Sequence, residues 1–409
     1  MDDLRLERAK LIAKNRQLRK AANGTWIVLS QTRPGTRYTV NPIPGTCSCP
    51  DYAQWELPCK HLYAVKMIDV PEPPNADRDA PKPVDADEVK LIKRKTYPQD
   101  WSAYNAAQIG EKETFQLLLR SLCDGIACER NARGRPRLPL SDVLYASVLK
   151  VYTTVSGRRA STDIRECEKK GHLRHAPHHN SISDYLRRED LTPVLKQLIE
   201  ISAAPLKAVE KQFAVDGTGF STCTYARWFD HRYGEEKRQQ IWIKAHAMIG
   251  TKTNIVTAVE ITQGEMHDSP QFAGLVKATA QRFDVQEVSA DKAYMSHRNL
   301  DAVGEAGGMA YIPFKSNHRG AGPELWRKLW HLFWYRRDEF EKHYHQRSNV
   351  ESTFSAIKRK FGGALRSKDL VSQTNECLCK ILAFNITVLI HEMHELGIKI
   401  DFAEATDVA

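Results

Sequence analysis

The sequence lacks any run of 18 consecutive apolar residues, so it does not predict a membrane-spanning helix. The most apolar stretch, residues 377–390, is interrupted by Lys380, Asn385 and Thr387, and we expect no membrane partner. Residues 1–20 contain acids and no apolar segment, so we expect no secretory signal. The chain has nine cysteines among 409 residues, too few for a disulfide scaffold, and their odd number favours reduced thiols and a cytoplasmic location.

Acidic residues are fewer than basic ones. The chain has 50 Asp and Glu against 60 Lys and Arg, which gives a net charge of +10. Hydrophobic residues make up 42% and charged residues 27%, as in folded soluble proteins and unlike disordered ones. The surplus of positive charge is a modest indication of a polyanionic partner and does not identify a function by itself.

Four segments of different composition divide the chain, in line with a domain size of about 150 residues. Residues 1–70 combine a basic helix expected over 2–22 with two β-rich runs, 26–30 and 37–40, that predict a hairpin. Residues 71–100 form a linker rich in proline and acids. Residues 101–210 are predicted to be a helical DNA-binding domain. Residues 211–400 alternate β-rich runs with helical segments, which predicts an α/β catalytic domain with a mixed sheet.

Three cysteines and a histidine follow the hairpin in the pattern C-x-C-x9-C-x-H. They are Cys47, Cys49, Cys59 and His61. A structural zinc ion binds four thiolate or imidazole ligands in a tetrahedron, and two such pairs on two chain turns can supply them. The pattern resembles the SWIM zinc finger at every ligand position. The resemblance implies one structural Zn²⁺ and binding to DNA or protein.

Two aspartates follow apolar runs that predict core strands. Asp216 comes after 213–215, and Asp291 comes after 285–290. An acid at the end of a core strand is costly to desolvate unless it is paired or binds metal. Two such aspartates and a glutamate from a packed helix can hold two Mg²⁺ or Mn²⁺ ions about 3.5–4 Å apart and so promote phosphodiester chemistry.

The glutamate is Glu351, in a segment that we expect to form one helix. At about 100° per residue, Glu351 shares a face with Tyr344, Arg347 and Lys358. An adjoining apolar stripe predicts the buried face of this helix; it consists of Val350, Phe354, Ile357 and Phe361. Taken alone, Arg347 and Glu351 at positions i and i+4 are also explained as an ordinary helix ion pair.

Together these positions resemble the DDE transposases of bacterial insertion sequences, which have an RNase H-like core and a Y-(2)-R-(3)-E-(6)-K signature. The resemblance covers about residues 110–395. It implies an enzyme that cleaves DNA and transfers strands, with Asp216, Asp291 and Glu351 as catalytic metal ligands. It also implies that Arg347 and Lys358 contact phosphates and that Tyr344 packs near an unpaired end nucleotide. Residues 267–269 and 292–294, including Lys292, look like family segments near the metal, although a helix cap explains the first equally well.

Two features depart from this family pattern. The zinc finger lies outside it, so recognition of the DNA ends can be built differently here. Asp291 and Glu351 are only 60 residues apart in the sequence. This interval is too short for the β-strand insertion that some relatives carry.

Basic segments extend the prediction of DNA binding. Residues 327–368 contain eleven Lys or Arg and four acids, and phosphate contacts dominate DNA affinity. Residues 133–137, with Arg133 and Arg135, have the form of an AT-hook for the minor groove, although a basic turn before a helix explains them as well. Residues 161–186 are compatible with a helix-turn-helix and with plain three-helix packing. We therefore expect double-stranded DNA as partner, a homodimer on DNA and a cytoplasmic, nucleoid-associated protein.

Two other functions remain open at this stage. One is a zinc-finger DNA-binding regulator whose RNase H-like domain has lost catalysis. The other is a metal-dependent nuclease that hydrolyses DNA without joining strands. The presence of all three acids favours an active enzyme over the regulator.

Overall fold

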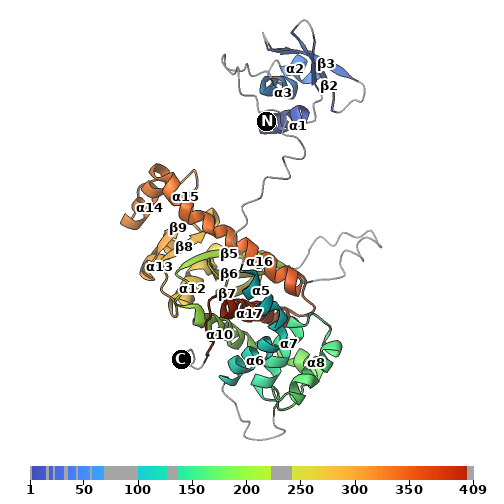
Figure 1. Ribbon diagram of the computed structural model, residues 1–409. Helices are drawn as coiled ribbons and strands as arrows, with labels where there is room; N and C mark the ends of the chain where they lie inside the picture. Colours follow the sequence, from blue (N-terminus) through green and yellow to red (C-terminus); the bar gives the residue numbers. More distant parts are fainter. Residues whose placement is uncertain are drawn as a thin grey trace. The chain divides into compact units, whose positions relative to one another are not determined.

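A computed structural model describes residues 2–14, 18–21, 24–31, 36–42, 45–55, 58–68, 100–126, 137–222 and 242–402 (Figure 1). The chain divides into two compact units, Met1–Thr96 and Tyr97–Ala409. Each unit is described by itself below. The predicted linker at 71–100 lies outside the described residues except for its last position.

The first unit is a small sheet covered by helices. Its strands β1 (Leu18–Lys20), β2 (Trp26–Leu29), β3 (Arg37–Asn41) and β4 (Thr46–Cys47) form one antiparallel sheet in this order. The hairpin predicted at 26–40 is confirmed, with Trp26 opposite Val40. Helices α2 (Pro50–Trp55) and α3 (Lys60–Ile68) follow the sheet.

The helix expected over 2–22 is shorter than predicted. Helix α1 runs over Asp2–Lys14, and Leu18–Lys20 forms β1 instead. Pairing with β2 accounts for this difference, because the backbone N–H and C=O groups of residues 18–20 form hydrogen bonds with β2 instead of with a continued helix. The core of the unit contains Ile12 of α1, Trp26 and Val28 of β2, and Leu62 and Val65 of α3.

The second unit begins with helices: α5 (Trp101–Ile109), α6 (Glu111–Asp124), α7 (Leu140–Tyr152), α8 (Gly157–Lys169), α9 (His179–Leu186) and α10 (Leu191–Ala203), followed by a 3-10 turn, η1 (Ala204–Leu206). The connector between α8 and α9, residues 170–178, is longer than the turn of about three or four residues in a helix-turn-helix. The helices therefore pack without that motif's short turn. The predicted AT-hook residues Arg133 and Arg135 lie outside the described residues.

A five-stranded mixed sheet forms the centre of the second unit, as predicted for an RNase H-like core. Its strands are β5 (Gln212–Ser221), β6 (Trp242–Gly250), β7 (Val256–Gln263), β8 (Glu287–Ala290) and β9 (Met309–Tyr311). Their order is β7-β6-β5-β8-β9. The first three strands pair antiparallel, whereas β5–β8 and β8–β9 are parallel. The crossover between the parallel strands β8 and β9 contains the helix α13 (His297–Glu305).

The strand that carries Asp216 is longer than predicted. Asp216 lies in the middle of β5 rather than at its end, because the antiparallel ladder with β6 continues to Ser221. The parallel ladder with β8 stops at the pair Val215 and Ala290. Asp216 is thus the first residue of β5 beyond its pairing with β8, and Asp291 directly follows the end of β8.

Helices flank the sheet: α12 (Ser269–Ala280), α14 (Glu324–Tyr335), α15 (Arg337–Tyr344), α16 (Ser348–Phe361) and α17 (Leu370–Glu395), with 3-10 turns η2 (Lys292–Tyr294) and η3 (His345–Arg347). The segment expected as one helix is divided among α15, η3 and α16. The predicted stripe on α16, Val350, Phe354, Ile357 and Phe361, is buried as expected.

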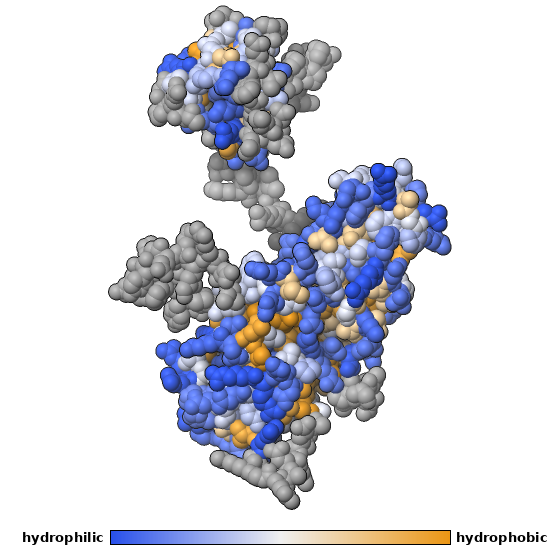
Figure 2. All heavy atoms as spheres, turned by 180° about the vertical axis from the view of Figure 1, so that it is seen from behind, coloured by the Kyte–Doolittle hydropathy of each residue, from blue (hydrophilic) through white to orange (hydrophobic). Residues whose placement is uncertain are grey.

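Helix α17 is the central helix of the second unit. It is long and apolar enough to cross a membrane, but 83% of its most apolar window is buried inside the protein, as in a core helix. Asn385, in its middle, is fully buried. Its amide donates to the carbonyl of Val256 at 2.7 Å and to Ser202 Oγ at 2.9 Å, and its oxygen accepts from Val256 N at 2.9 Å. These bonds tie α10 and the edge strand β7 to α17. Figure 2 shows a face of the second unit on which hydrophilic side chains surround a central group of hydrophobic ones.

We predict that Asn385→Ala destabilises the second unit by roughly 2–4 kcal/mol, because it leaves buried backbone and hydroxyl groups without partners. Denaturant unfolding followed by tryptophan fluorescence measures the effect. Asn105→Ala, at an exposed position of α5, is the matched control and should change the free energy of unfolding by less than about 0.5 kcal/mol. Equal effects of the two substitutions would contradict this role of Asn385.

Candidate active site and metal centre

Arg347 joins two of the predicted acids. Its Nη2 lies 2.9 Å from Asp216 Oδ2, and its Nη1 lies 3.3 Å from Glu351 Oε1. Two carboxylates that bind one guanidinium lie within about 9 Å of each other. Glu351 comes from the first turn of α16, Arg347 from η3 directly before it and Asp216 from β5. The fold thus brings together Asp216 and Arg347, which are 131 positions apart.

Asp291 lies beside this group. It follows Ala290, the last residue of β8, whose partner on β5 is the neighbour of Asp216. Adjacent strands lie about 4.8 Å apart, so Asp216 and Asp291 are side by side at this edge. Asp291 also caps the turn η2, where its Oδ1 accepts from Lys292 N at 2.7 Å. The side chain of Lys292 is exposed.

The electrostatics of Asp216 reflect its burial among acids. Burial raises the pKa of Asp216 above its ordinary value, and Glu351 and Asp291 also raise it. The backbone N–H of Gly217, which donates to Asp216 Oδ1 at 2.8 Å, and the charge of Arg347 oppose this shift in the pKa. The site therefore concentrates negative charge that one arginine only partly neutralises.

The other two signature residues flank the acids. Lys358 Nζ donates to Thr218 Oγ1 at 2.7 Å and lies 5.4 Å from the ring centre of Phe220. Burial lowers the pKa of Lys358. Tyr344 is half-buried at the end of α15, where its ring stacks on Phe340. All four signature positions thus lie at one site although a 3-10 turn interrupts the helix.

A second polar cluster lies on the opposite face of β5. Gly217 and His246 are partners on β5 and β6, and alternation along β5 turns this position away from the face of Asp216. His246 is fully buried, and its Nδ1 lies 3.5 Å from Asp268 Oδ1. Asp268 also pairs with Lys244. Gly217 permits this approach, because a Cβ there would lie only 3.0 Å from Lys244 Cε.

The sequence analysis missed Lys244 and His246, and it placed Asp268 near the metal or in a helix cap. The structure shows no cap hydrogen bond from Asp268. The one local sign of this cluster is Gly217, which lies opposite the buried His246. This pairing can be recognised only when the register of β5 and β6 is known.

Four ligand-type side chains of the first unit meet as predicted. The potential ligand atoms of Cys47, Cys49, Cys59 and His61 all lie within 4.8 Å of one another, and all four residues are buried. Both Cys47 Sγ and Cys59 Sγ lie 3.9 Å from His61 Nδ1. Tetrahedral zinc with bonds of about 2.3 Å to sulfur and 2.0 Å to nitrogen places such atoms about 3.5 Å apart, so this set fits zinc.

Crowding of the thiols supports metal binding. Hydrogen bonds from Cys47 and Cys59 lower the pKa of the Cys49 thiol, whereas the hydrogen bond with Cys49 raises the pKa of Cys47. Buried thiols this close together cannot all ionise without repulsion between the thiolates. A zinc ion removes this repulsion because it binds all of them as thiolates.

The three acids differ from this preformed set. Among the residues that the structure describes, Asp216, Asp291 and Glu351 do not form a comparably tight cluster, since Arg347 lies between two of them. Their oxygen donors suit Mg²⁺ or Mn²⁺. Glu351 has 64% of its side chain exposed, whereas Asp216 has 19%, so Glu351 has the freedom to move toward the aspartates.

Comparison with known proteins finds two families in the chain. A model described as the transposase DDE domain matches residues 207–386, which contain all three acids. A model described as the SWIM zinc finger matches residues 38–67, which contain the four Cys and His ligands. No solved structure matches the chain significantly.

We predict that the purified protein contains about one zinc ion per chain and that Cys59→Ser loses it, because three ligands bind zinc far more weakly than four. Elemental analysis measures the metal. Cys167→Ala removes a buried cysteine of α8 in the second unit and should leave the zinc content unchanged. Wild-type protein without zinc, with Cys59→Ser folding normally, would contradict this assignment.

Proposed function

Because residues 207–386 form a transposase DDE domain and residues 38–67 a SWIM zinc finger, we propose that this transposase binds transposon ends, cleaves the DNA and transfers the freed strands to a target. The observation that carries the proposal is the convergence of Asp216, Asp291 and Glu351 around one arginine. The mutual repulsion of these three acids opposes folding, and a bound divalent cation would relieve it.

In this proposal Asp216, Asp291 and Glu351 together hold two Mg²⁺ or Mn²⁺ ions. Bound there, such ions activate water or a 3′-hydroxyl and stabilise the leaving oxygen of a phosphodiester. The chain contributes a fixed pair of carboxylates, Asp216 and Asp291, on adjacent strands. It contributes a third, more exposed carboxylate, Glu351, which completes the set when it leaves Arg347.

Two cations, Arg347 of η3 and Lys358 of α16, complement the acids. Once Glu351 no longer pairs with it, the Nη1 group of Arg347 is available to a phosphate oxygen, while Nη2 still holds Asp216. Lys358 reaches the same face of β5 through Thr218 and is a second phosphate contact in our proposal. Tyr344 packs against an unpaired end nucleotide, with Lys292 exposed nearby at the end of β8.

The remaining parts of the chain serve recognition in this proposal. The helical segment 101–210 binds double-stranded DNA, with Arg133 and Arg135 in the minor groove, and the zinc finger binds DNA or protein. Cleavage of two ends together requires at least a homodimer on DNA, in a cytoplasmic, nucleoid-associated complex.

We predict that Asp216→Asn, Asp291→Asn and Glu351→Gln each abolish Mg²⁺- or Mn²⁺-dependent cleavage of an end-containing duplex while duplex affinity stays within a few fold of wild type. Each substitution removes a charged metal ligand but keeps the shape of the side chain. Gel analysis of cleavage and fluorescence anisotropy of binding measure the two properties. Asp284→Asn, at an exposed acid before β8, is the matched control.

Cleavage by all three variants would refute the proposal. A wild-type protein that binds ends but never nicks them would indicate a regulator without catalysis. An assay with a labelled 3′-hydroxyl end and a plasmid target distinguishes a transposase from a nuclease that only hydrolyses DNA. Only the transposase joins the labelled end to the plasmid.

A further inference from the structure

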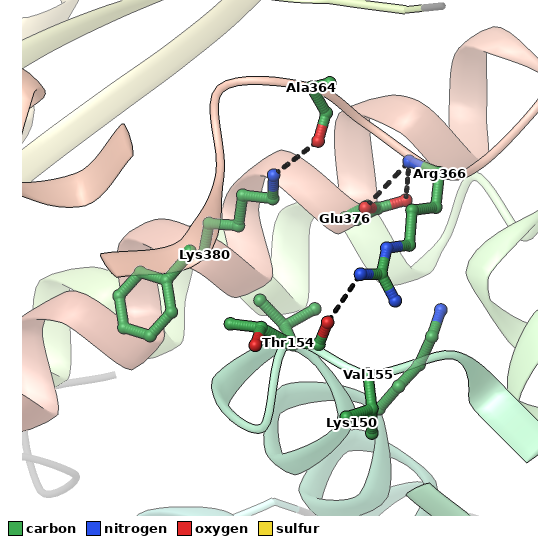
Figure 3. Close-up of a pocket in the computed structure, with 9 residues that line it drawn as sticks. Lys150, Thr154, Val155, Ala364, Arg366, Glu376 and Lys380 are labelled. Carbon is green, nitrogen blue, oxygen red and sulfur yellow. Dashed lines mark hydrogen bonds between the residues drawn. The ribbon is translucent and has the colours of Figure 1, made fainter. Parts of the chain in front are cut away.

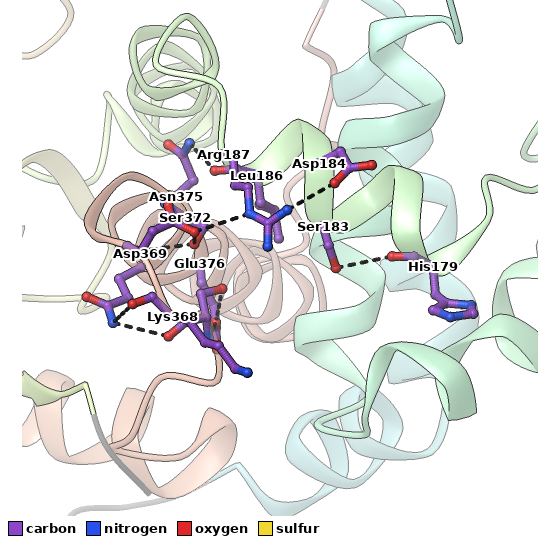
Figure 4. Close-up of polar contacts among 12 residues, drawn as sticks. His179, Ser183, Asp184, Leu186, Arg187, Lys368, Asp369, Ser372, Asn375 and Glu376 are labelled. Atoms are coloured by element: carbon purple, nitrogen blue, oxygen red, sulfur yellow. Dashed lines mark hydrogen bonds and ion pairs between the residues drawn. The ribbon is translucent and has the colours of Figure 1, made fainter.

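A basic pocket lies in the second unit away from the acids. Two adjoining hollows share Lys150 of α7 and Arg366 of the segment between α16 and α17. We call this segment, residues 362–369, the α16–α17 loop. The first hollow continues to Lys380 of α17, and the second continues to Arg187 after α9 and to Lys368. The two hollows are lined by five cations from four parts of the chain and by two acids, Glu376 and Asp369. Figure 3 labels Lys150, Arg366 and Lys380, and Figure 4 labels Arg187 and Lys368.

Buried charges of α17 make the α16–α17 loop rigid. Glu376 accepts from the backbone N–H groups of Arg366 and Ser367 at 2.8–3.1 Å. Lys380 Nζ donates to the carbonyls of Gly362 and Ala364 at 2.7 and 2.8 Å (Figure 3). These hydrogen bonds shape the loop. Glu376 and Lys380 are both almost fully buried and carry opposite charges, so as a pair they leave the net charge of the hollow unchanged.

A strained residue positions Arg366. Thr154, just after α7, has a φ of 56°, which is unfavourable for a β-branched side chain. Its carbonyl accepts a hydrogen bond from the Arg366 guanidinium (Figure 3). Strain of this kind persists where the surrounding structure imposes it, and it concentrates at functional sites.

The acids near the pocket are already paired. Arg187 Nη1 lies 3.1 Å from Asp184, and its Nε lies 3.4 Å from Asp369 (Figure 4). Among the residues that the structure describes, the side chains of Lys150 and Lys368 have no acidic partner, and the guanidinium of Arg366 bonds only to the neutral carbonyl of Thr154. The pocket thus presents three uncompensated positive charges, which complement the phosphates of a nucleic acid.

The α16–α17 loop is also connected to the strand of the acids. Ser221, at the end of β5, bridges to Ala364, and its backbone bonds Gly363 and Leu365 at 3.1 and 2.8 Å. Ser221 is five residues from Asp216, about 17 Å along a strand. This span corresponds to roughly five base pairs of duplex. A duplex that runs from Asp216 along β5 therefore reaches the α16–α17 loop, which carries Arg366 and Lys368.

We propose that Lys150, Arg366 and Lys368 form a docking site for the phosphate backbone of double-stranded DNA, beyond the end of β5 that leads away from Asp216. The proposal rests on the proposed function and adds a second anchoring point to it. A second anchoring point fixes the direction of the duplex on the protein. With a contact at the acids alone, the duplex could rotate about that contact.

The test is the salt dependence of binding by the full-length chain to a labelled duplex, without added Mg²⁺ so that no cleavage occurs. The double variant Lys150→Ala/Lys368→Ala should bind roughly tenfold or more weakly. Its slope of log K against log salt should fall by about 0.9 for each lost contact, close to 1.8 in total. Lys207→Ala/Lys277→Ala, which removes two exposed lysines elsewhere, is the control of equal charge and should nearly retain the wild-type slope.

An unchanged slope in Lys150→Ala/Lys368→Ala, or an equal fall in the control, would overturn the docking site. The docking site for DNA would also be overturned if the wild-type protein bound duplex RNA more tightly than duplex DNA and only the RNA affinity fell in the double variant. A wild-type protein that shows the expected slopes but never cleaves DNA would refute the transposase proposal and leave the docking site supported. Cleavage together with an unchanged slope would refute the docking site alone.

Discussion

The fold of the second unit depends at its centre on how the charge of Asp216 is compensated. This carboxylate lies in the middle of β5 with 19% of its side chain exposed, where an unpaired charge is costly. Arg347 compensates it from η3, directly before α16, and the Gly217 N–H adds a hydrogen bond. The ion pair and the stripe of Val350, Phe354 and Ile357 together fix α16 over this face of the sheet. Glu351 then lies near the aspartates as a consequence.

The buried charges of α17 are likewise compensated by specific partners. Lys380 and Glu376 are almost fully buried, yet both bond to the backbone of the α16–α17 loop rather than to each other. Because replacing either one would leave backbone groups unsatisfied, these charges specify a single conformation of the loop. Asn385 does the same for the edge strand β7. One buried helix therefore positions the sheet, the loop and the helical segment.

Much of this arrangement follows from the sequence. The acids after apolar runs, the stripe on α16 and the Cys/His spacing are local patterns with a direct physical cause, and they located the strands β5 and β8 and the zinc ligands. Other features depend on contacts between distant segments. The extension of β5 past Asp216 comes from β6, and β1 forms because β2 offers a partner. The cluster of Lys244, His246 and Asp268 requires the β5–β6 register, which no local pattern specifies.

The pairing state of each cation separates structural charges from charges available to a ligand. Lys244 and Arg187 have acidic partners, so binding a phosphate with them would cost an existing ion pair. The side chains of Lys150, Arg366 and Lys368 have no acidic partner among the described residues, so a phosphate would break no ion pair to bind them. Arg347 is intermediate, since it gives up the exposed Glu351 more readily than the buried Asp216. An incoming DNA backbone should therefore engage the pocket without rearrangement, whereas engagement at the acids requires Glu351 to leave Arg347 first.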